Sequence, residues 1–304
     1  MRRLAVAAVT LTAATARADH DIAGGVTLVA SYAGEVFVAP ALDDDRAAVA
    51  GLAELALTVD LATLVDDRLG AARVAGFAIH GDGLSAQLME VLGVSNNVAE
   101  EDVRLHEAWI EQPFGPVTLR AGLLAADEEF VIAEQASLLA GATFGMVGMF
   151  SSNVGNPIYP VATPGASARF EHGDVVARAA VYADPHDDHG IPRSLGDEAL
   201  AFGELALGGA KLGAWHHTLL GSGYHAILDA ELDAEHGGFL RAAYSPDGPI
   251  TSYADAGVRK GTSSVGLAFA RTDLGAQTLV EATHQWAATA WLTIQPIAQL
   301  VLVR

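Results

Sequence analysis

The chain has no cysteine and very little lysine. The absence of cysteine from the 304 residues excludes a disulfide framework, zinc–thiolate sites and cysteine nucleophiles. The lysines are Lys211 and Lys260, and 37 acidic residues against 17 Lys and Arg give a formal net charge of −20. Because a nucleic-acid-binding protein presents a basic face to the phosphates, this composition argues against nucleic acid as a partner.

Long apolar segments are also absent. Hydrophobic residues make up 51% of the chain, as in a membrane protein, yet beyond the N-terminus there is no run of about 18 apolar residues. The nearest candidate, residues 136–150, is interrupted by Gly141, Gly145 and Gly148 and is too short to span as a helix. Every backbone polar group in lipid must be satisfied within the protein, so the remaining way to cross a membrane is a closed β-barrel.

The N-terminus has the pattern of a secretory signal peptide. Two arginines precede an apolar run at residues 4–14, which is shorter than the roughly 20 residues of a spanning helix. Ala16 and Ala18 then fit the small-residue pattern of a signal peptidase site. We therefore expect a signal peptide at residues 1–18, export through the Sec pathway, cleavage after Ala18 and a barrel domain at residues 19–304. Cleavage would remove three arginines and move the net charge from −20 to −23. An uncleaved N-terminal anchor is the alternative.

Apolar and polar side chains alternate in segments of about ten residues, as in transmembrane β-strands with one face toward lipid. In residues 224–233, Tyr224 and Leu228 fall on one face, whereas His225 and Asp229 fall on the other. Turn signals separate such segments at short intervals and predict hairpins. The pattern predicts an all-β fold, a transmembrane antiparallel up-and-down β-barrel. Fifteen strands are predicted, at residues 26–38, 47–61, 71–80, 103–112, 116–124, 164–172, 174–183, 197–207, 210–219, 223–233, 238–245, 252–260, 263–272, 276–287 and 289–303.

Two interruptions do not have strand patterns. Residues 84–92 have the apolar spacing of a short amphipathic helix that starts near Ser85. Residues 125–164 have an acidic start, a Gly-rich apolar middle and a Pro-rich end. A connection that long is usually functional, and inside a barrel it can fold inward and narrow the pore. An external loop or a plug of inert packing is the alternative for each interruption.

Several ordered motifs make the chain similar to the carbohydrate-selective porin family, OprB. The similarity is strongest over residues 32–185 and looser in the C-terminal half. The motifs are HGDGLSA (80–86), GVSN (93–96), LHEAWIEQPF (105–114), GLLAADEEF (122–130), TFG (143–145), PIYPVATPGASARF (157–170), VYADP (181–185), LVEATHQW (279–286) and AWLTIQP (290–296).

The resemblance implies an outer-membrane barrel of sixteen strands that passes sugars or other small solutes by diffusion. The chain departs from the family pattern after Pro296, where the family usually continues with a turn and one more strand that ends at an aromatic residue. The fifteen predicted strands agree with this shortfall, and an odd number does not close the usual bacterial barrel. We therefore expect a barrel of about sixteen strands. Fifteen are counted, and one interpretation of the shortfall is that the final strand is missing.

Charged and aromatic residues on predicted lumen faces are the candidates for the pore lining. Opposed acidic and basic arcs would create a transverse field that selects dipolar solutes, and an aromatic face would contact sugar rings. Structural pairing of these charges across neighbouring strands is an equal alternative. The candidates are Glu107, Trp109 and Glu111 on one strand, and Arg120, Arg169 and Arg178 on its neighbours.

The start of the long connection adds Asp127, Glu128 and Glu129 as a candidate acidic ring, although a solvated loop start explains them equally well. No metal site is predicted. The loop His186-Asp187-Asp188-His189 has no ordered scaffold, and His216 and His217 point to opposite faces of a strand.

The function predicted from these features is an outer-membrane porin for carbohydrates and other small hydrophilic solutes, with no cofactor. No Gly-x-Ser-x-Gly elbow, phosphate loop or His-Glu-x-x-His motif is present, so an enzyme is not predicted. A secreted β-rich binding protein or adhesin is the main alternative, and a barrel-embedded hydrolase is a weaker one. The expected partners are sugars, outer-membrane lipid and lipopolysaccharide, with the chain acting as a monomer or a homotrimer.

Overall fold

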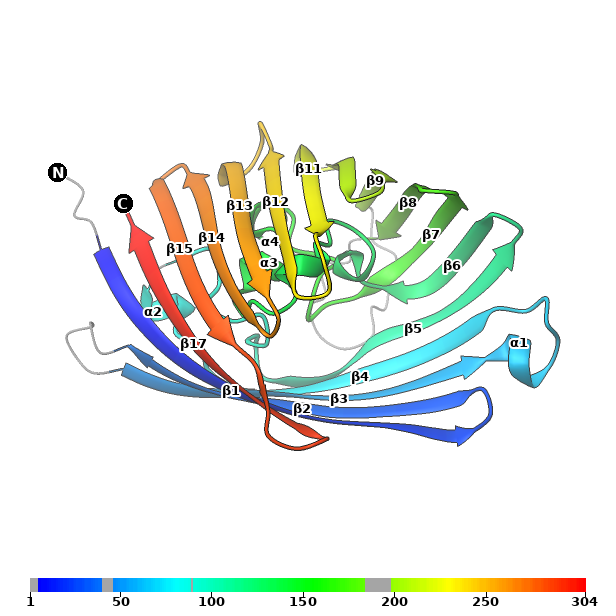
Figure 1. Ribbon diagram of the computed structural model, residues 1–304. Helices are drawn as coiled ribbons and strands as arrows, with labels where there is room; N and C mark the ends of the chain where they lie inside the picture. Colours follow the sequence, from blue (N-terminus) through cyan, green and yellow to red (C-terminus); the bar gives the residue numbers. More distant parts are fainter. Residues whose placement is uncertain (1–4, 40–45, 89, 184–197) are drawn as a thin grey trace.

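The computed structural model describes residues 5–39, 46–88, 90–183 and 198–304, which form one closed antiparallel β-sheet (Figure 1). The strands are β1 (Ala5–Ala23), β2 (Val26–Ala39), β3 (Arg46–Asp60), β4 (Ala71–Gly81), β5 (Asp102–Phe114), β6 (Val117–Leu124), β7 (Thr163–His172), β8 (Val175–Ala183), β9 (Ala199–Leu207), β10 (Ala210–His217), β11 (Gly221–Glu231), β12 (His236–Tyr244), β13 (Ile250–Lys260), β14 (Ser263–Thr272), β15 (Gly275–His284), β16 (Trp286–Ala287) and β17 (Leu292–Val303). The short helices are α1 (Leu61–Leu64), α2 (Ser85–Leu88), η1 (Ala126–Glu128), η2 (Glu134–Ala136), α3 (Ala142–Gly145) and α4 (Gly148–Asn153), where η denotes a 3-10 helix.

Each strand pairs with its neighbours in sequence, and β1 closes the ring by pairing with both β17 and β2. The two-residue β16 and the longer β15 both pair with β17, so they occupy one strand position in the barrel. The barrel therefore has sixteen strand positions. All fifteen strands predicted from alternation are present. The up-and-down barrel is confirmed, and a sandwich of two packed sheets is ruled out as the fold.

The expectation of a missing final strand is wrong for this fold, because the sixteenth strand of the barrel is β1, at the N-terminal end of the chain. β1 includes most of the segment predicted to be a signal peptide, and Thr15 faces Thr293 of β17 in the ladder. Small and apolar residues in a run of this length suit either a signal peptide or a barrel strand, so the pattern alone does not separate them. Cleavage after Ala18 stays a prediction, and it would remove residues 5–18 of β1.

The outer face of the barrel is apolar, as the alternation predicts. Tyr224 and Leu228 are 56% and 57% exposed on the outside of β11, whereas His225 and Ile227 are buried on its inner side. The same alternation continues on β14, where Leu267 is half exposed. Within the described residues, no helix is both long and apolar enough to cross a bilayer.

Short turns gather at one rim of the barrel and long connections at the other, because successive antiparallel strands reverse direction. Residues 115–116, 173–174, 208–209 and 261–262 make tight turns at the first rim. Gly173, Gly208 and Gly261 have φ values of 56°, 55° and 56°, in the left-handed region that favours glycine. At the opposite rim are the two longest described connections, residues 82–101 and 125–162.

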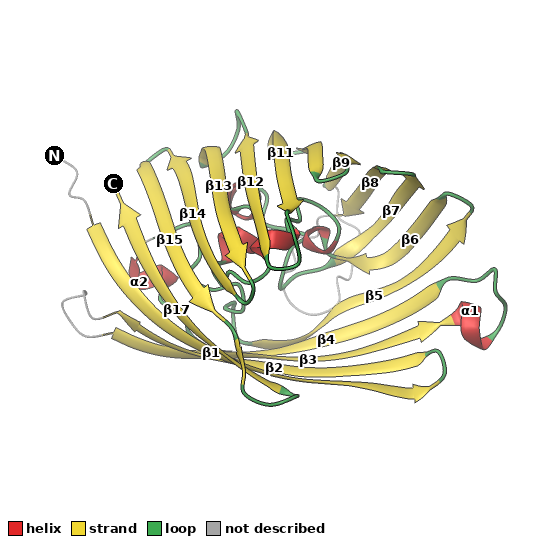
Figure 2. Cartoon of the chain, viewed as in Figure 1, coloured by secondary structure: helices red, strands yellow, loops and turns green. Residues whose placement is uncertain are grey.

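Both long connections fold into the barrel. We call residues 125–162 the inner loop and residues 82–101 the cap segment. Figure 2 shows their helices α2, α3 and α4 enclosed by the ring of strands. Inward folding is therefore confirmed, and the external-loop reading is wrong for both. The predicted short helix of the cap segment is α2, and its Leu88 is buried together with the flanking Leu84 and Leu92.

The inner loop is anchored on a charged pair in the barrel wall. Arg241 of β12 is fully buried and donates to Asp255 Oδ1 of β13 over 3.0 Å. Its guanidinium also donates to the backbone carbonyls of Thr143, Phe144 and Gly145, over 2.9, 3.0 and 2.7 Å. On β15, Glu281 accepts bonds from the backbone N–H groups of residues 140 and 141 over 2.7 and 2.9 Å. Buried charges satisfied in this way fix one position of the loop.

Aromatic packing fills the space between the inner loop and the same side of the wall. Phe130 stacks on Phe202 of β9 with ring centroids 4.7 Å apart, and Phe150 meets Trp215 of β10 edge-on at 5.5 Å. Backbone bonds then join the inner loop to the cap segment, because Asn96 N–H donates to the Ala140 carbonyl over 2.8 Å. The covered wall runs from β9 to β17, and the open part of the lumen lies toward β3 to β8.

Candidate functional site

The open wall carries a row of basic side chains. Arg120 of β6, Arg169 of β7 and Arg178 of β8 point into the lumen, and Arg169 lies directly opposite Arg178 in the ladder between their strands. Facing side chains of paired antiparallel strands project from the same surface of the sheet. The strand register therefore turns three arginines that are far apart in the sequence into one basic row.

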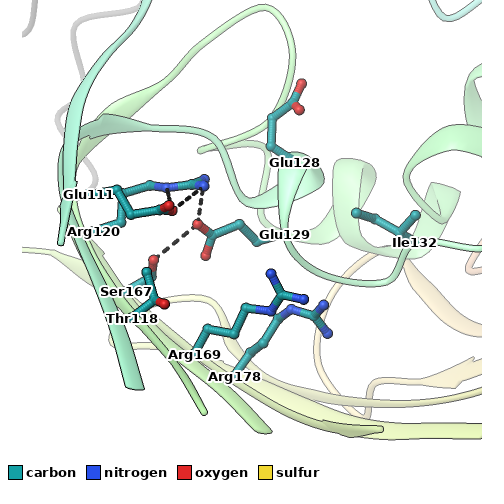
Figure 3. Close-up of a pocket in the computed structure, with 9 residues that line it drawn as sticks. All are labelled: Glu111, Thr118, Arg120, Glu128, Glu129, Ile132, Ser167, Arg169 and Arg178. Carbon is teal, nitrogen blue, oxygen red and sulfur yellow. Dashed lines mark hydrogen bonds and ion pairs between the residues drawn. The ribbon is translucent and has the colours of Figure 1, made fainter. Parts of the chain in front are cut away.

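The inner loop places acidic groups opposite this row. β6 ends at Leu124, and the chain turns at once into η1, whose single turn closes through the bond from Glu129 N–H to the Ala126 carbonyl. Asp127, Glu128 and Glu129 follow one another around this turn, so their carboxylates point in different directions. Figure 3 shows that Glu129 extends toward the basic row, whereas the carboxylate of Glu128 points away from it, although both residues line the same space.

A cavity of about 120 Å³ is lined by both the acidic and the basic groups (Figure 3). At about 30 Å³ per water molecule in the liquid, it has room for only a few waters. Its lining includes six of the nine predicted site residues. The lining residues are Glu111, Thr118, Arg120, Glu128, Glu129, Ile132, Ser167, Arg169 and Arg178.

Arg120 is the most connected of the basic residues. It donates to Glu111 Oε2 over 2.7 and 3.1 Å and to Glu129 Oε1 over 2.8 Å. Its guanidinium carbon lies 4.2 Å from the ring centroid of Trp109, a cation–π distance. Ser167 Oγ also donates to Glu129 Oε1, over 3.0 Å. Arg120 therefore joins strand β5 to the inner loop, and the charge pairing across neighbouring strands considered as the alternative is present here.

Arg169 and Arg178 are less constrained. Arg169 pairs with Glu171 near the rim, and both side chains are about half exposed, so this pair adds little stability. Arg178 Nη1 lies 3.5 Å from Glu204 Oε1 of β9. Glu204 also accepts bonds from Val131 N–H of the inner loop over 3.1 Å and is 3.0 Å from His225 Nε2. Figure 3 shows the two guanidinium groups side by side beneath Glu129.

Three predicted residues lie outside this cavity. Glu107 is 5% exposed and accepts a bond from Arg73 Nε of β4 over 3.1 Å. Trp109 lies beneath Arg120 and supports it from the wall. Asp127 turns toward the far end of the inner loop, where its Oδ2 accepts the N–H of Tyr159 over 3.0 Å.

Sequence reasoning missed Arg73 and Glu54 as members of the charged wall. Arg73 Nη2 donates to Glu54 Oε1 of β3 over 2.9 Å, in addition to its bond with Glu107. Arg73 is the only Arg, Lys, Asp or Glu in the mostly apolar segment 71–80. Alternation gives the face of each strand but not the register between β4 and β5, which a long connection joins, so it does not predict which carboxylate faces Arg73.

Two acidic groups at the start of the inner loop have raised pKa values. Burial raises the pKa of Asp127 to about 6, opposed by the hydrogen bond from Tyr159 N–H. Enclosure by protein also raises the pKa of Glu128 to about 7, and the neighbouring charges of Asp127 and Glu107 raise it further. Both groups therefore titrate close to neutral pH.

The remaining histidine predictions concern metals. The loop at residues 186–189 lies outside the described residues. His217 is buried, whereas the neighbouring His216 is exposed and its Nδ1 lies 2.9 Å from Ser222 Oγ, so the two side chains are on opposite faces as predicted. The described parts of the chain contain no group of three or more His, Cys, Asp or Glu side chains placed to hold a metal ion.

Comparisons with known proteins agree with this architecture. The family model described as "Carbohydrate-selective porin, OprB family" matches residues 44–228, which is more than half of the chain. A high-pH structure of Pseudomonas putida OprB has a TM-score of 0.73 and 12% identity, covering 98% of this chain and 93% of that one. Two mutants of the Rh. blastica porin have TM-scores of 0.52 and 0.51 at 11% identity, covering 99% of this chain and 100% of theirs. No curated protein matches the chain.

The structural neighbours share the fold at low identity, and the family match covers the strands and the inner loop that build the charged cavity. The closed barrel, the inward-folded loops and the family match all point to the same class of protein. The chain belongs to the carbohydrate-selective porin family, OprB, and is an outer-membrane porin.

Proposed function

We propose that sugars and other small hydrophilic solutes cross this barrel between the acidic start of the inner loop and the basic row of β6 to β8. The observation that carries the proposal is the cavity of about 120 Å³ with Glu128 and Glu129 on one side and Arg169 and Arg178 on the other. A gap this small strips water from a solute, and charged groups on both sides replace the lost hydrogen bonds. The opposed charges also produce a transverse field that orients dipolar solutes.

In this proposal the nine site residues have different roles. Glu128, Glu129, Arg169 and Arg178 contact the solute, because they line the cavity and are only partly engaged by other side chains. The others position these groups or their supports. They are Glu107, Trp109, Glu111, Arg120 and Asp127.

Charge neutralisation on the two sides of the cavity tests the route. We expect Arg178→Gln to raise the cation preference of the channel and Glu128→Gln to lower it at pH 8, by about two- to five-fold in permeability ratio, as expected for one charge about 4 Å from the path. The measurement is the reversal potential of single channels in a potassium chloride gradient. Arg271→Gln is the matched control, because Arg271 continues the outward-facing positions of β14.

Equal reversal potentials in all three variants would contradict the route. A separate measurement tests whether the protein forms a pore at all. Liposomes that contain purified protein should swell in sugar solutions, and failure to swell, together with absence of single-channel conductance, would contradict passive diffusion itself.

Export and assembly complete the proposal. The N-terminal pattern supports Sec export with cleavage after Ala18, and N-terminal sequencing of protein from outer membranes should then read Asp-His-Asp-Ile from Asp19. The apolar outer face fits a surround of membrane lipid and lipopolysaccharide. Native mass spectrometry separates a monomer from a homotrimer.

A further inference from the structure

The apolar outer face of β14 is followed, near the end of the strand, by an arginine. Val265, Leu267 and Phe269 face outward in turn, and Arg271 takes the next outward position, beside the turn at residues 273–274. A charged side chain on the lipid side of a barrel is costly at the bilayer centre and tolerated only near its surface. In the described part of the chain the guanidinium of Arg271 forms no hydrogen bond or ion pair. It is therefore free to bind a group outside the protein.

The strand register brings a second arginine to the same level. Arg271 faces Ala276 of β15 in the ladder, and Ala276 exchanges backbone hydrogen bonds of 3.2 and 3.0 Å with Arg304, the residue after β17. Because paired residues of antiparallel strands project from the same face, the two arginines flank the small side chain of Ala276. Two strand spacings separate their backbones by about 10 Å. Both long side chains can therefore reach one group bound between them.

A groove of about 620 Å³ lies between the two arginines. It is lined by two guanidinium groups and a single acidic side chain, Asp273, so basic side chains outnumber acidic ones. The hydroxyl of Thr272 is already engaged, because it accepts the N–H groups of residues 274 and 275 over 3.2 and 3.1 Å. The lining residues are Phe269, Arg271, Thr272, Asp273, Gly275, Ala276 and Arg304. This chemistry suits a compact anion such as a phosphate group.

The neighbouring strands show at which depth of the membrane this groove lies. Along the ladders Arg271 faces Ser252, Ser252 faces Tyr244, and Tyr244 faces Tyr224. Both tyrosines are more than half exposed on the outer face, and exposed tyrosines of a barrel lie where hydrocarbon meets headgroups. The arginines are on the rim of the long connections, which in bacterial barrels faces the cell exterior. The groove therefore opens among the headgroups of the outer leaflet.

An apolar groove of about 600 Å³ continues along the same wall, across β11 to β15, which lie side by side in Figure 1. Small residues make a dent among larger ones there. The outward-facing residues include the small Ala230, Gly238 and Ala256 and the larger Leu228, Leu240 and Leu267. Leu267 precedes Arg271 by four residues, which is about 13 Å along a strand. An acyl chain attached to a headgroup at the arginines is long enough to enter this apolar groove.

We infer that Arg271 and Arg304 bind a phosphate group of lipid A, the phosphorylated and acylated part of lipopolysaccharide, with one acyl chain in the apolar groove. A guanidinium matches phosphate with two parallel hydrogen bonds. The inference rests on the proposed surround of lipopolysaccharide and gives it one defined contact. It is independent of the solute route through the cavity of about 120 Å³ in the lumen, the charged gap. Arg271→Gln thus remains a control for that route in bilayers free of lipopolysaccharide.

Titration with lipid A tests the site. Native mass spectrometry of the purified protein in detergent counts bound copies of lipid A that carries both phosphates and of the same lipid without them. We expect the native protein to bind the phosphorylated form more tightly. Arg271→Gln and Arg304→Gln should each weaken its apparent affinity by about ten-fold, which corresponds to about 1.4 kcal/mol. The double variant should no longer distinguish the two forms.

Two matched controls accompany these variants. Lys260→Gln removes one charge from the outer side of β13 at the opposite rim and should leave lipid A affinity unchanged. Ala256→Phe fills the apolar groove, so it should weaken both forms of lipid A equally and keep the preference for phosphate. Ala201→Phe makes the same change on the outer face of β9, away from both grooves, and should have no effect.

The outcomes separate this inference from the proposed surround of lipopolysaccharide. Equal lipid A affinity in the native protein and the arginine variants would overturn the site while leaving the surround intact. Failure of the native protein to bind lipid A at all would overturn both. Phosphatidylglycerol bound as tightly as lipid A would overturn the assignment to lipopolysaccharide. Weaker binding in the arginine and Ala256 variants, with Lys260→Gln and Ala201→Phe unchanged, supports the site.

Discussion

Arg120 shows how one side chain in this barrel serves both structure and selectivity. It pairs with Glu111 of the wall and Glu129 of the inner loop and lies over the ring of Trp109. Removing one partner of such a partly buried network leaves the others uncompensated. Substitutions of Arg120 therefore change the position of the loop as well as the field, which is why Arg178, held by one distant carboxylate, is the cleaner probe of charge.

At the same scale, the raised pKa values of Asp127 and Glu128 predict a pH-dependent channel. The pKa of Glu128 is about 7 and that of Asp127 is about 6, so both carboxylates are charged at pH 8 and neutral at pH 5. Their negative charge attracts cations, and protonation removes it. We expect cation preference to fall as the pH is lowered from 8 to 5, measured by reversal potential.

Glu128→Gln is the control for this titration. It should flatten the part of the pH profile near 7 and leave the part near 6, because Asp127 remains. A profile that is equally steep in the native protein and the variant would contradict the assignment to Glu128.

Sequence reasoning reached the residues of the charged gap but not their partners. Alternation placed Glu111, Arg120 and Arg178 on lumen faces, because the side-chain period of a strand is two. It could not tell that Glu107 accepts a bond from Arg73, because no short turn joins β4 to β5 and the pattern alone does not set their register. It also offered Asp127, Glu128 and Glu129 as a single ring, whereas the η1 turn directs Asp127 toward Tyr159 at the far end of the inner loop.

At the scale of elements, the inner loop was predictable as an interruption of strand pattern but not as a docked structure. Its anchors, Arg241 and Glu281, lie 98 and 141 residues further along the chain than the loop residues Thr143 and Ala140 that they bind. No local pattern links them to the loop, because the contact exists only once the barrel has closed. The same holds for Asn96, which reaches the pore only through bonds between the cap segment and the inner loop.

The anchor predicts what releases the inner loop. Arg241→Met removes four bonds to loop carbonyls and leaves Asp255 without its cation, a change that costs about 3–5 kcal/mol in buried pairs. The closed ladder of strands holds the barrel, so we expect the loop to loosen first and single-channel conductance to become larger and noisier.

Arg259→Met is the graded control, because Arg259 Nε reaches the loop only through Gln135, over 2.8 Å. Its effect on conductance should be smaller than that of Arg241→Met. Deletion of residues 133–153 should widen the pore furthest, and an unchanged conductance and size cut-off in that deletion would show that the loop does not set the constriction.

At the scale of the whole molecule, closure depends on β1, which bridges β17 and β2. Without residues 5–18 the two neighbouring strands would present unpaired edges, which are prone to pair with other chains. We predict that the full chain refolded in detergent resists heat to a higher temperature than a chain beginning at Asp19, as seen by heat-modifiable gel mobility.

The position of β1 in the refolded full chain can be checked directly. The protein has no cysteine, so a disulfide between Thr15→Cys and Thr293→Cys reports only the pairing of β1 with β17. Leu240→Cys, on the outside of β12, replaces the second cysteine in the control. Equal heat resistance of the two chains, with no disulfide at residues 15 and 293, would contradict closure by β1.

Because the inner loop docks mainly on one side of the barrel, the two sides of the lumen wall have different functions. Residues from β9 to β17 hold the loop, as Arg241 and Glu281 do, and residues of β6 to β8 face the passing solute. In a saturation mutagenesis screen, the first half should yield variants with a changed size limit, and the second should yield intact barrels that rank solutes differently. Solute preference in this barrel can therefore be retuned at Arg169 of β7 and Arg178 of β8 without repacking the rest, whereas Arg120 of β6 also holds the inner loop.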